Sequence, residues 1–236
     1  ELTKVFTNKP GYEVGTSYSK ESSKEVTLDA VFKENDIVVD FSNAALVGKI
    51  LEAGIKNPKP LIICTTGWDQ TALKAQLEEF TTKAPLIIAT NTSIGAAVQR
   101  YVVRKVAEVL GEEFDIDLHE KHHRFKVDSP SGTAVTLVND LLLAKKNAQN
   151  LEYESYIVGQ EARPERKVGV SVQRSGSIVG EHEVSFTSLE EQITIKHTAF
   201  DRALFAKGAA KAVEWLLEKK ISPGSYTMFD LLQLKD

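Results

Sequence analysis

Cysteine is nearly absent from this sequence, since Cys64 is the single cysteine among 236 residues. One thiol cannot close an internal disulfide, which excludes a small secreted fold held by disulfides and indicates a reducing compartment. Apolar runs of the roughly 20 residues that a membrane-spanning helix needs are also missing, and the first residues show no basic-then-apolar leader. These absences predict a cytoplasmic protein with no membrane partner.

An excess of positive charge is missing as well. The formal charge at pH 7 is −4, from 29 Lys and Arg against 33 Asp and Glu. Proteins that bind nucleic acid favour a basic face, so no nucleic-acid partner is expected. The apolar share of 42% and the charged share of 26% are ordinary for a globular protein with one large or two small cores.

The first ninety residues alternate short apolar runs with helical patterns. β-branched runs without polar alternation are typical of strands buried on both faces, and their alternation with helices indicates an α/β, doubly wound parallel sheet of Rossmann type. Ligands of such sheets bind beyond the carboxyl ends of the strands, so we expect a cofactor at the turns after Phe41, Cys64 and Ala89. The expected strands are Ile37–Phe41, Leu61–Cys64 and Leu86–Ala89, and the expected helices are Ala44–Ala53, Asp69–Phe80 and Ile94–Leu110.

The beginning of the chain is unusual for this fold. Leu2–Thr7 has the composition of a strand, yet no glycine-rich strand-to-helix turn occurs upstream of Ile37. A dinucleotide-binding fold normally opens with a strand, such a turn and a helix, about 30 residues in all. We therefore expect a Rossmann-like sheet whose first strand and glycine-rich turn are missing.

Near Glu113 the pattern changes from apolar runs to alternation. Phe114, Ile116 and Leu118 alternate with polar residues, which predicts a strand with one buried and one solvent-exposed face. We predict two domains: 1–93 binds a dinucleotide, with 201–236 returning to it, and 94–200 is an α+β domain with a mixed or antiparallel sheet for substrate binding and oligomerisation. Its further elements are a helix over Gly132–Lys146, antiparallel strands over Val168–Val172, Glu181–Phe186 and Gln192–Thr198, and then a returning helix over Asp201–Lys219.

The densest polar cluster, from 117 to 134, contains the letters H-E-x-x-H from His119 to His123. That pattern binds zinc on a helix, where residues four apart share one face. The preceding alternation predicts a strand instead, on which four residues span about 13 Å. Two imidazoles so far apart do not hold one ion at about 2.1 Å, so no metal is expected.

The same cluster has the chemistry of an anion site. His122, His123, Arg124 and Lys126 concentrate positive charge, and Ser131-Gly132-Thr133 follow Pro130 at an expected helix start. Free amides at a helix N-terminus attract anions, and Gly132 adds no Cβ to hinder their approach. We therefore expect a small acidic substrate, with a histidine and a lysine available for proton transfer.

This cluster resembles the signature of the 4-hydroxy-tetrahydrodipicolinate (dihydrodipicolinate) reductase family. The family pattern E-[IV]-x-E-x-H-x-x-x-K-x-D-x-P-S-G-T-A is met without exception from Glu120 to Ala134, and Asp117-Leu118 depart from it conservatively. The resemblance covers nearly the whole chain except the family's opening G-x-x-G-[RK]-M-G turn. Looser likenesses are Cys64–Trp68 to G-T-T-G-[FY], Ala89–Gly95 to A-x-N-[FM]-S-x-G with Thr92 in its bulky apolar place, and Arg174–His182 to R-x-G-x-[IV]-x-G-x-H.

The resemblance implies an NADPH- or NADH-dependent reduction of 4-hydroxy-tetrahydrodipicolinate to tetrahydrodipicolinate in lysine and diaminopimelate biosynthesis. His122 would be the catalytic acid/base and Lys126 the proton donor, while His123 would contact the dicarboxylate substrate. Gly132 and Thr133 would bind one of its carboxylates. The family's second domain commonly builds a homotetramer.

The resemblance also implies where the cofactor would lie. Aligning Leu2–Phe6 with the second strand puts Asn8 and Lys9 at the adenosine ribose without an acidic residue, which favours acceptance of NADPH alongside NADH. The other implied contacts are the turn residues Cys64, Thr65, Thr66, Ala89, Thr90, Asn91 and Thr92, together with Arg202 and Phe205 from the last helix.

Two other interpretations stay open. One is a different two-domain dehydrogenase that acts on a small amino or keto acid. The other is a non-catalytic protein that binds a dicarboxylate or a partner. His182 and His197 lie in expected strands, where structural hydrogen bonding is the more common role of a histidine.

Overall fold

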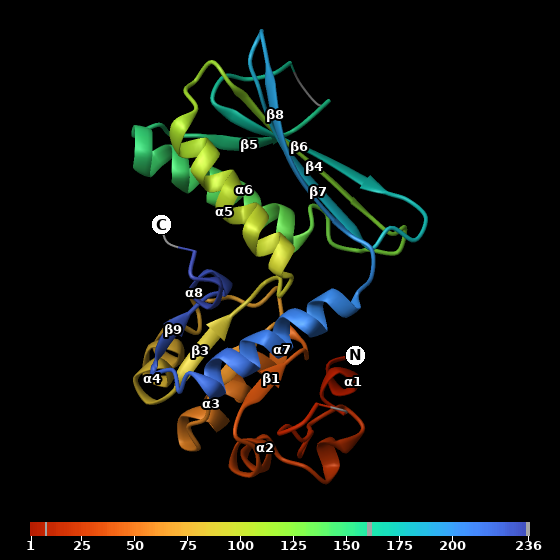
Figure 1. Ribbon diagram of the computed structural model, residues 1–236, viewed down its shortest axis with the longest axis vertical. Coiled ribbons are helices and arrows are strands. Elements are labelled where there is room, and N and C mark those ends of the chain that lie inside the picture. Colours follow the sequence, from red (N-terminus) through yellow and green to blue (C-terminus); the bar gives the residue numbers. More distant parts are fainter. Residues whose placement is uncertain (8, 160–161, 235–236) are drawn as a thin grey trace. The chain divides into compact units, whose positions relative to one another are not determined.

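The computed structural model describes residues 1–7, 9–159 and 162–234. The chain divides into two compact units (Figure 1): unit 1 comprises Glu1–Ser93 and Ala203–Asp236, and unit 2 comprises Ile94–Arg202. Among the described residues, no helix is both long enough and apolar enough to cross a membrane.

Unit 1 is built on a parallel sheet with strand order β1-β2-β3-β9. The three predicted strands are confirmed as β1 (Val38–Asp40), β2 (Leu61–Ile63) and β3 (Pro85–Ile88). All three residues of β2 are 0% exposed, which explains why the run lacks polar alternation. The fourth strand, β9 (Gly224–Tyr226), pairs in parallel with β3 and was not among the expected strands.

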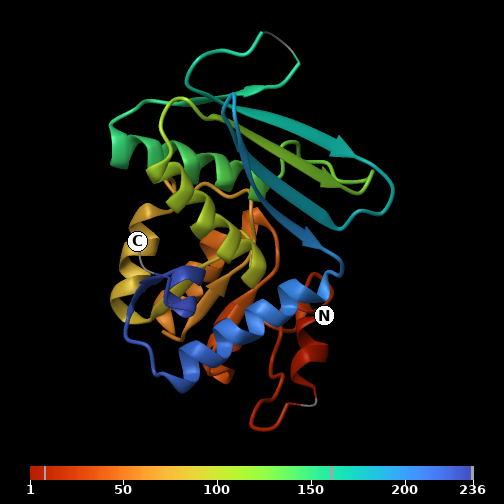
Figure 2. The ribbon, with the colours of Figure 1, turned by 45° about the horizontal axis from the view of Figure 1, so that its top comes forward.

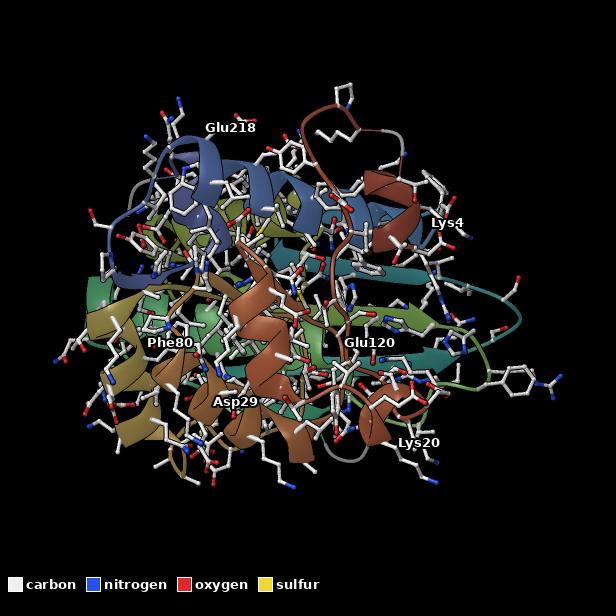
Figure 3. All side chains as sticks on the ribbon, turned by 90° about the horizontal axis from the view of Figure 1, so that it is seen from below. Lys4, Lys20, Asp29, Phe80, Glu120 and Glu218 are labelled. Atoms are coloured by element: carbon white, nitrogen blue, oxygen red, sulfur yellow. The ribbon has the colours of Figure 1, made fainter. Side chains whose placement is uncertain are left out.

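Helices pack on both faces of this sheet. Phe32, Leu51 and Phe80 are fully buried against Leu61, Ile63 and Leu86 of the strands, and exposed charges such as Lys4, Lys20 and Glu218 point outward (Figure 3). Helix α7 crosses the sheet in both ribbon views (Figures 1 and 2) and contacts β2. The remaining elements of unit 1 are η1 (Ser22–Lys24), α2 (Leu28–Glu34), η2 (Ala44–Leu46), α3 (Val47–Lys56), α4 (Lys74–Lys83), α7 (Ala203–Glu218) and α8 (Met228–Leu232).

The strand expected over Leu2–Thr7 is wrong, because Leu2–Phe6 forms helix α1. The Thr7 amide donates to the Thr3 carbonyl at 2.9 Å, and Phe6 is buried beside Tyr12, with ring centroids 5.3 Å apart. A short apolar run does not distinguish helix from strand by periodicity. The alignment that put Asn8 and Lys9 at the end of a second strand therefore loses its premise. Asn8 lies outside the described residues, and the Lys9 ammonium is paired with Glu214 of α7.

Unit 2 contains a mixed five-stranded sheet in the order β5-β6-β4-β7-β8, with α5 and α6 on one face (Figures 1 and 2). The antiparallel expectation for Val168–Val172 is wrong. Its strand β6 runs parallel to both β4 and β5, which becomes possible because α6 lies between β4 and β6 in the chain. The elements are α5 (Ile94–Val109), β4 (Asp115–His122), α6 (Gly132–Gln149), β5 (Glu154–Ile157), β6 (Lys167–Arg174), β7 (Gly180–Thr187) and β8 (Gln192–Ala199).

Helix α7 packs directly against the backbone of the turn that follows β3. The Thr92 hydroxyl donates to the Phe205 carbonyl at 2.7 Å, and a Cβ built on Gly208 would stand 1.8 Å from the Thr92 carbonyl oxygen. Only a glycine fits this contact, because the clashing atom belongs to the backbone and cannot rotate away.

We therefore expect Gly208→Ala to lower the free energy of unfolding of unit 1 by about 1–3 kcal/mol or more, the usual range for overpacking. The matched control is Gly48→Ala in α3, where the added Cβ would meet nothing closer than a Leu73 side-chain atom at 3.4 Å. There the better helix propensity of alanine should leave stability unchanged or raise it by about 0.5–1 kcal/mol. Urea unfolding followed by tryptophan fluorescence measures both, since Trp68 and Trp215 lie in unit 1. Equal effects of the two substitutions would contradict the close approach.

Candidate active site

The carboxyl end of β4 changes from apolar to polar on its buried face. Along this strand Ile116, Leu118, Glu120 and His122 are buried and alternate with partly exposed residues. Side chains two residues apart share one face of a strand, so Glu120 and His122 continue the line of the core residues. Glu120 is 0% exposed and His122 is 8% exposed.

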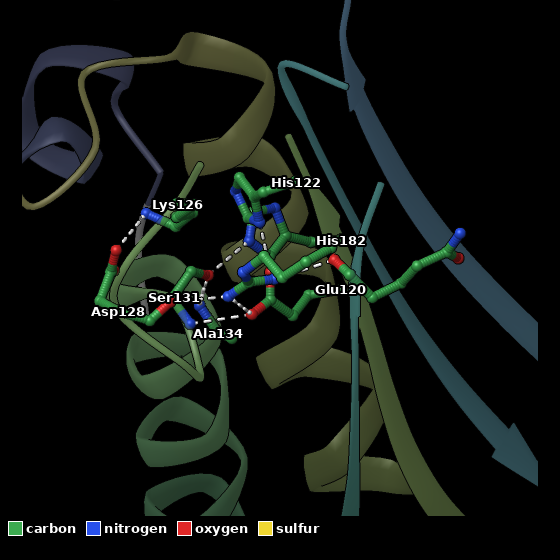
Figure 4. Close-up of polar contacts among 9 residues, drawn as sticks. Glu120, His122, Lys126, Asp128, Ser131, Ala134 and His182 are labelled. Carbon is green, nitrogen blue, oxygen red and sulfur yellow. Dashed lines mark hydrogen bonds and ion pairs between the residues drawn. The ribbon is translucent and has the colours of Figure 1, made fainter. Parts of the chain in front are cut away.

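The Glu120 carboxylate has a partner on each oxygen. One oxygen bonds to His122 Nδ1, and the other accepts from the Ser131 amide and from Arg174 Nη2, each at 2.9 Å (Figure 4). Burial raises the pKa of Glu120, but the hydrogen bonds from His122, Arg174 and Ser131 outweigh it and lower the pKa to about 2 from the ordinary 4.5. Glu120 is therefore a buried anion at neutral pH.

His182 of β7 packs edge-on against His122, with ring centroids 5.1 Å apart. Its Nε2 lies 3.0 Å from the Ser131 hydroxyl (Figure 4), and that hydroxyl caps α6 by accepting from the Ala134 amide at 3.2 Å. Burial, helped by the positive charge of His122, lowers the pKa of His182 to about 3. His182 is thus a neutral hydrogen-bonding ring, the role its sequence position indicated.

A single carboxylate, that of Asp128, engages two of the predicted site residues, the proton donor Lys126 and the substrate-binding Gly132. The Lys126 ammonium lies 2.8 Å from the Asp128 carboxylate (Figure 4). Burial raises the pKa of Asp128, but hydrogen bonds from Lys126, its own amide and the Gly132 amide lower it overall. Gly132 is exposed, and a Cβ on it would meet nothing within 4 Å. Lys126 and the start of α6 therefore form a cradle that holds a carboxylate.

Further positive charge surrounds this cradle. Desolvation and the charges of Arg202, His122, Lys126 and Arg174 lower the pKa of His123. Within unit 2 the fold thus brings together the predicted residues His122, His123, Lys126, Gly132 and Arg202. Such a cluster attracts an anion and disfavours a second cation.

The predicted cofactor turns lie together at the carboxyl ends of the strands in unit 1, which we call the carboxyl edge of the sheet. Asp40 is in register with Ile63, and Ile63 with Ile88, so the turns that begin at Phe41, Cys64 and Ala89 are neighbours. Two buried side-chain oxygens at this edge, Asp40 Oδ2 and Thr65 Oγ1, have no hydrogen-bond partner among the described residues. Buried polar atoms rarely remain unsatisfied, so this edge has the chemistry of a ligand site.

The turn residues differ in whether their polar groups are already hydrogen-bonded within the protein and in how exposed they are. The amides of Cys64 and Ala89 continue the sheet ladder to Asp40 and Ile63, and burial raises the pKa of the Cys64 thiol. Thr66 is exposed and Thr90 is partly exposed. The Asn91 side chain accepts from the Ser93 amide at 2.8 Å, and Thr92 and Phe205 are bonded to each other as described above.

A cavity of about 800 Å³ lies along β1 and reaches Asp40, Phe41 and Ser42. Its lining excludes the turns at Thr65 and Asn91 and includes Tyr12 and Val213. The sequence predicted a cofactor at the turn after Phe41, but neither Phe41 nor Ser42 was named there as a cofactor contact.

The segment from His119 to His122 is a strand, as expected, so the helical H-E-x-x-H arrangement does not occur. The His119 ring lies on the other face, 2.6 Å from the Ser171 hydroxyl. Among the described residues, Glu120, His122 and His182 form the one group whose donor atoms lie within 4.8 Å of one another. Those atoms already bond to each other and to Ser131, and the Arg174 guanidinium on Glu120 disfavours a cation there.

Comparison with known proteins is decisive about the family. The model described as dihydrodipicolinate reductase, N-terminus, matches residues 1–92, and the model described as dihydrodipicolinate reductase, C-terminus, matches residues 95–232. The chain belongs to the dihydrodipicolinate reductase family.

Curated relatives are similar over most of their length. The 4-hydroxy-tetrahydrodipicolinate reductase of Chlamydia abortus is 36% identical over 226 residues, which cover 95% of this chain and 90% of the relative. That of Brachyspira hyodysenteriae is 39% identical over 208 residues, 86% of each chain. A solved structure with the same fold is the dipicolinate-bound dihydrodipicolinate reductase from Paenisporosarcina sp. TG-14, with a TM-score of 0.65 at 20% identity, covering 92% of this chain and 81% of that one.

Three polar residues of this family member were not assigned from its sequence: Glu120, Ser131 and Arg174. Glu120 could have been found, because it stands two residues before His122 on a predicted strand and so shares its face. Arg174 opens the R-x-G-x-[IV]-x-G-x-H pattern noted in the sequence, but its contact with Glu120 could not have been found there. That contact depends on the pairing of β6 with β4, in which His122 is in register with Arg174.

The acid stability of this reductase family member should depend on His182. Its pKa of about 3 lies below the ordinary 6.5, so between these values the unfolded chain binds a proton that the folded chain does not, and stability falls as the pH falls. His182→Gln keeps a donor for Ser131 and removes this titration. The pH slope of the unfolding free energy between pH 6.5 and 5 should then decrease by up to one proton, about 1.4 kcal/mol per pH unit. Urea unfolding followed by circular dichroism measures the slope, and an unchanged slope would contradict the buried neutral ring.

Proposed function

We propose that this protein catalyses the nicotinamide-dependent reduction of 4-hydroxy-tetrahydrodipicolinate to tetrahydrodipicolinate, a step in lysine and diaminopimelate biosynthesis. The observation that carries the proposal is the carboxylate cradle formed by the Lys126 ammonium and the Gly132 amide, which holds the Asp128 carboxylate. Family membership, with relatives named for this reaction, supports it.

The cradle fits the chemistry of a small dicarboxylate. A carboxylate binds well to amides at a helix N-terminus together with a cation, because partial and full positive charges act on the same oxygens. The Asp128 side chain is 56% exposed, so it can turn into solvent when a substrate carboxylate takes its place on Gly132 and Thr133. The cations around His123 suit the second carboxylate.

Proton supply is the chemical task of the basic residues. When bound, the nicotinamide cofactor supplies hydride, and the negative charge that this adds to the substrate must be neutralised by a proton. Lys126 is placed for this task, because its ammonium lies in the carboxylate cradle and its side chain is 22% exposed. We assign proton donation to Lys126, acid/base catalysis to His122, and substrate contact to His123.

The edge of the sheet in unit 1 is proposed to bind the dinucleotide, while unit 2 binds the substrate. The hydroxyl of Thr65, buried and unpartnered among the described residues, fits a ligand acceptor such as a phosphate or carboxamide oxygen. Because Leu2–Phe6 forms helix α1, the strand alignment that favoured NADPH no longer holds. We therefore propose either NADH or NADPH as the cofactor. The contacts proposed for either cofactor are Cys64, Thr65, Thr66, Ala89, Thr90, Asn91, Thr92, Arg202 and Phe205.

A homotetramer, built through the sheet of unit 2, remains part of the proposal, as does a cytoplasmic location. Helices cover one face of this sheet. The other face carries Asp117, His119 and Lys121 of β4 and partly exposed residues of β8.

Thr65→Val should weaken dinucleotide binding without destabilising the protein. The substitution removes a hydroxyl that has no partner in the described structure, so only the complex loses a hydrogen bond, worth about 1 kcal/mol or roughly fivefold in Kd. The matched control is Thr81→Val in α4, a residue outside the proposed cofactor contacts whose hydroxyl donates to the Leu77 carbonyl at 2.9 Å. It should leave cofactor binding unchanged. Fluorescence titration with NADH and with NADPH measures binding. Unchanged affinity for both would remove Thr65 from the cofactor site.

Lys126→Ala should lower kcat for the consumption of NADPH or NADH with 4-hydroxy-tetrahydrodipicolinate by roughly 10²–10⁴-fold, the usual contribution of a positioned proton donor. The matched control is Lys121→Ala, since Lys121 lies on the opposite face of β4 with its ammonium 3.8 Å from Glu181. That variant should keep wild-type kinetics.

The same assay separates the alternatives. Turnover of a small amino or keto acid, and none of the dipicolinate precursor, would favour a different dehydrogenase. Dicarboxylate binding without any turnover would favour a non-catalytic binding protein.

A further inference from the structure

We propose that Glu120 is the positioning residue of this active site: its carboxylate fixes the ring of His122 with Nδ1 turned inward and joins that ring to the start of α6. The catalytic consequence rests on the proposed function. The ring orientation itself does not, and it can be measured without turnover.

The two carboxylate oxygens of Glu120 have different hydrogen-bond partners. One bonds only to His122 Nδ1, whereas the other holds the Ser131 amide and Arg174 Nη2, each at 2.9 Å. Because the side chain of Glu120 is 0% exposed, water cannot replace any of these partners. A movement of the carboxylate would therefore break contacts with β4, β6 and α6 together, and this holds it in one place.

An ionised carboxylate only accepts hydrogen bonds. The Nδ1 atom of His122 must therefore carry a proton, which leaves Nε2 as the ring nitrogen able to accept or release a proton during reaction. Gly180 of β7 provides room for this side of the ring, since a Cβ there would stand 3.1 Å from Nε2. Glu120 thus decides which nitrogen of His122 is offered to a ligand.

Glu120 also balances the charge around His122. The groups that face His122 from the packed elements are neutral His182 of β7, Arg174 of β6, and His123 and Lys126 in the following loop. Each of these is neutral or positive, and Asp128 is engaged by Lys126. Glu120 is thus the anion in direct contact with the His122 ring among the described residues.

A purely structural role for Glu120 is the competing explanation. In that case the carboxylate would serve only to clamp Arg174 and the Ser131 amide, and its bond to His122 would be incidental. Arg174 also donates to the Asp128 carbonyl at 2.7 Å, so it holds the loop before α6 from a second point. The two explanations differ in what happens to the His122 ring and to the pH profile.

Ring-¹⁵N NMR of the wild-type protein tests the orientation directly. We expect the His122 resonances to show a proton on Nδ1 in a strong hydrogen bond at neutral pH, and Glu120→Gln to weaken that signal. An unprotonated Nδ1 in the wild type would overturn the proposal whether or not the enzyme is active, and whether or not the variant folds.

Kinetics test the consequence. Glu120→Gln should lower kcat by roughly 10–100-fold with KM changed less than about threefold, and should move the alkaline limb of the kcat profile to lower pH by about one unit, the effect of losing an adjacent opposite charge. Glu120→Asp keeps the charge and should restore the position of that limb. Glu183→Gln on β7, whose carboxylate faces Lys196 at 3.8 Å, is the matched control and should behave as wild type.

Arg174→Met separates positioning from clamping. It removes a cation near His122 but leaves the Glu120–His122 bond, so the alkaline limb should move to higher pH, opposite to Glu120→Gln. Shifts in the same direction for both variants, or an unmoved limb in Glu120→Gln, would overturn the proposal. Wild-type protein that does not reduce 4-hydroxy-tetrahydrodipicolinate while Nδ1 carries its hydrogen-bonded proton would instead refute the proposed function alone.

Discussion

The buried carboxylate of Glu120 is the constraint on which the site in unit 2 depends. An ionised group without water is costly to bury unless donors surround it. Here β4, β6 and α6 each supply one, through His122, Arg174 and the Ser131 amide. Satisfying this one anion therefore sets the end of β4, the register of β6 and the position of the α6 N-terminus relative to one another.

The anion-binding groups follow from that arrangement. Ser131 caps α6 and at the same time contacts Glu120 and His182, so the amides that come next in the helix have a fixed direction. Lys126 and Gly132 then meet around the Asp128 carboxylate. In unit 1 the equivalent constraint is the parallel register, which brings the ends of β1, β2 and β3 to one edge.

Most of the fold could be predicted because its elements have strong local signals. The strands β1 to β3 are continuous apolar runs, and β4 alternates with period two, so burial alone specifies them. The failures occur where such signals are weak. Helix α1 is a five-residue apolar segment, β9 has three residues after Pro223, and the parallel direction of β6 depends on a strand distant in sequence.

The sequence by itself determined the family, the order of the main elements and the residues of the carboxylate cradle, because these lie in one continuous stretch from Glu120 to Ala134 that carries its own chemistry. Tertiary structure alone decided that Arg174 shares the Glu120 carboxylate, that neutral His182 packs on His122, and that α7 reaches Thr92 at Gly208. Each of these contacts joins residues separated by tens of positions or more. Strand pairing and helix packing bring these residues together, and a local sequence pattern does not predict contacts between residues so far apart in the chain.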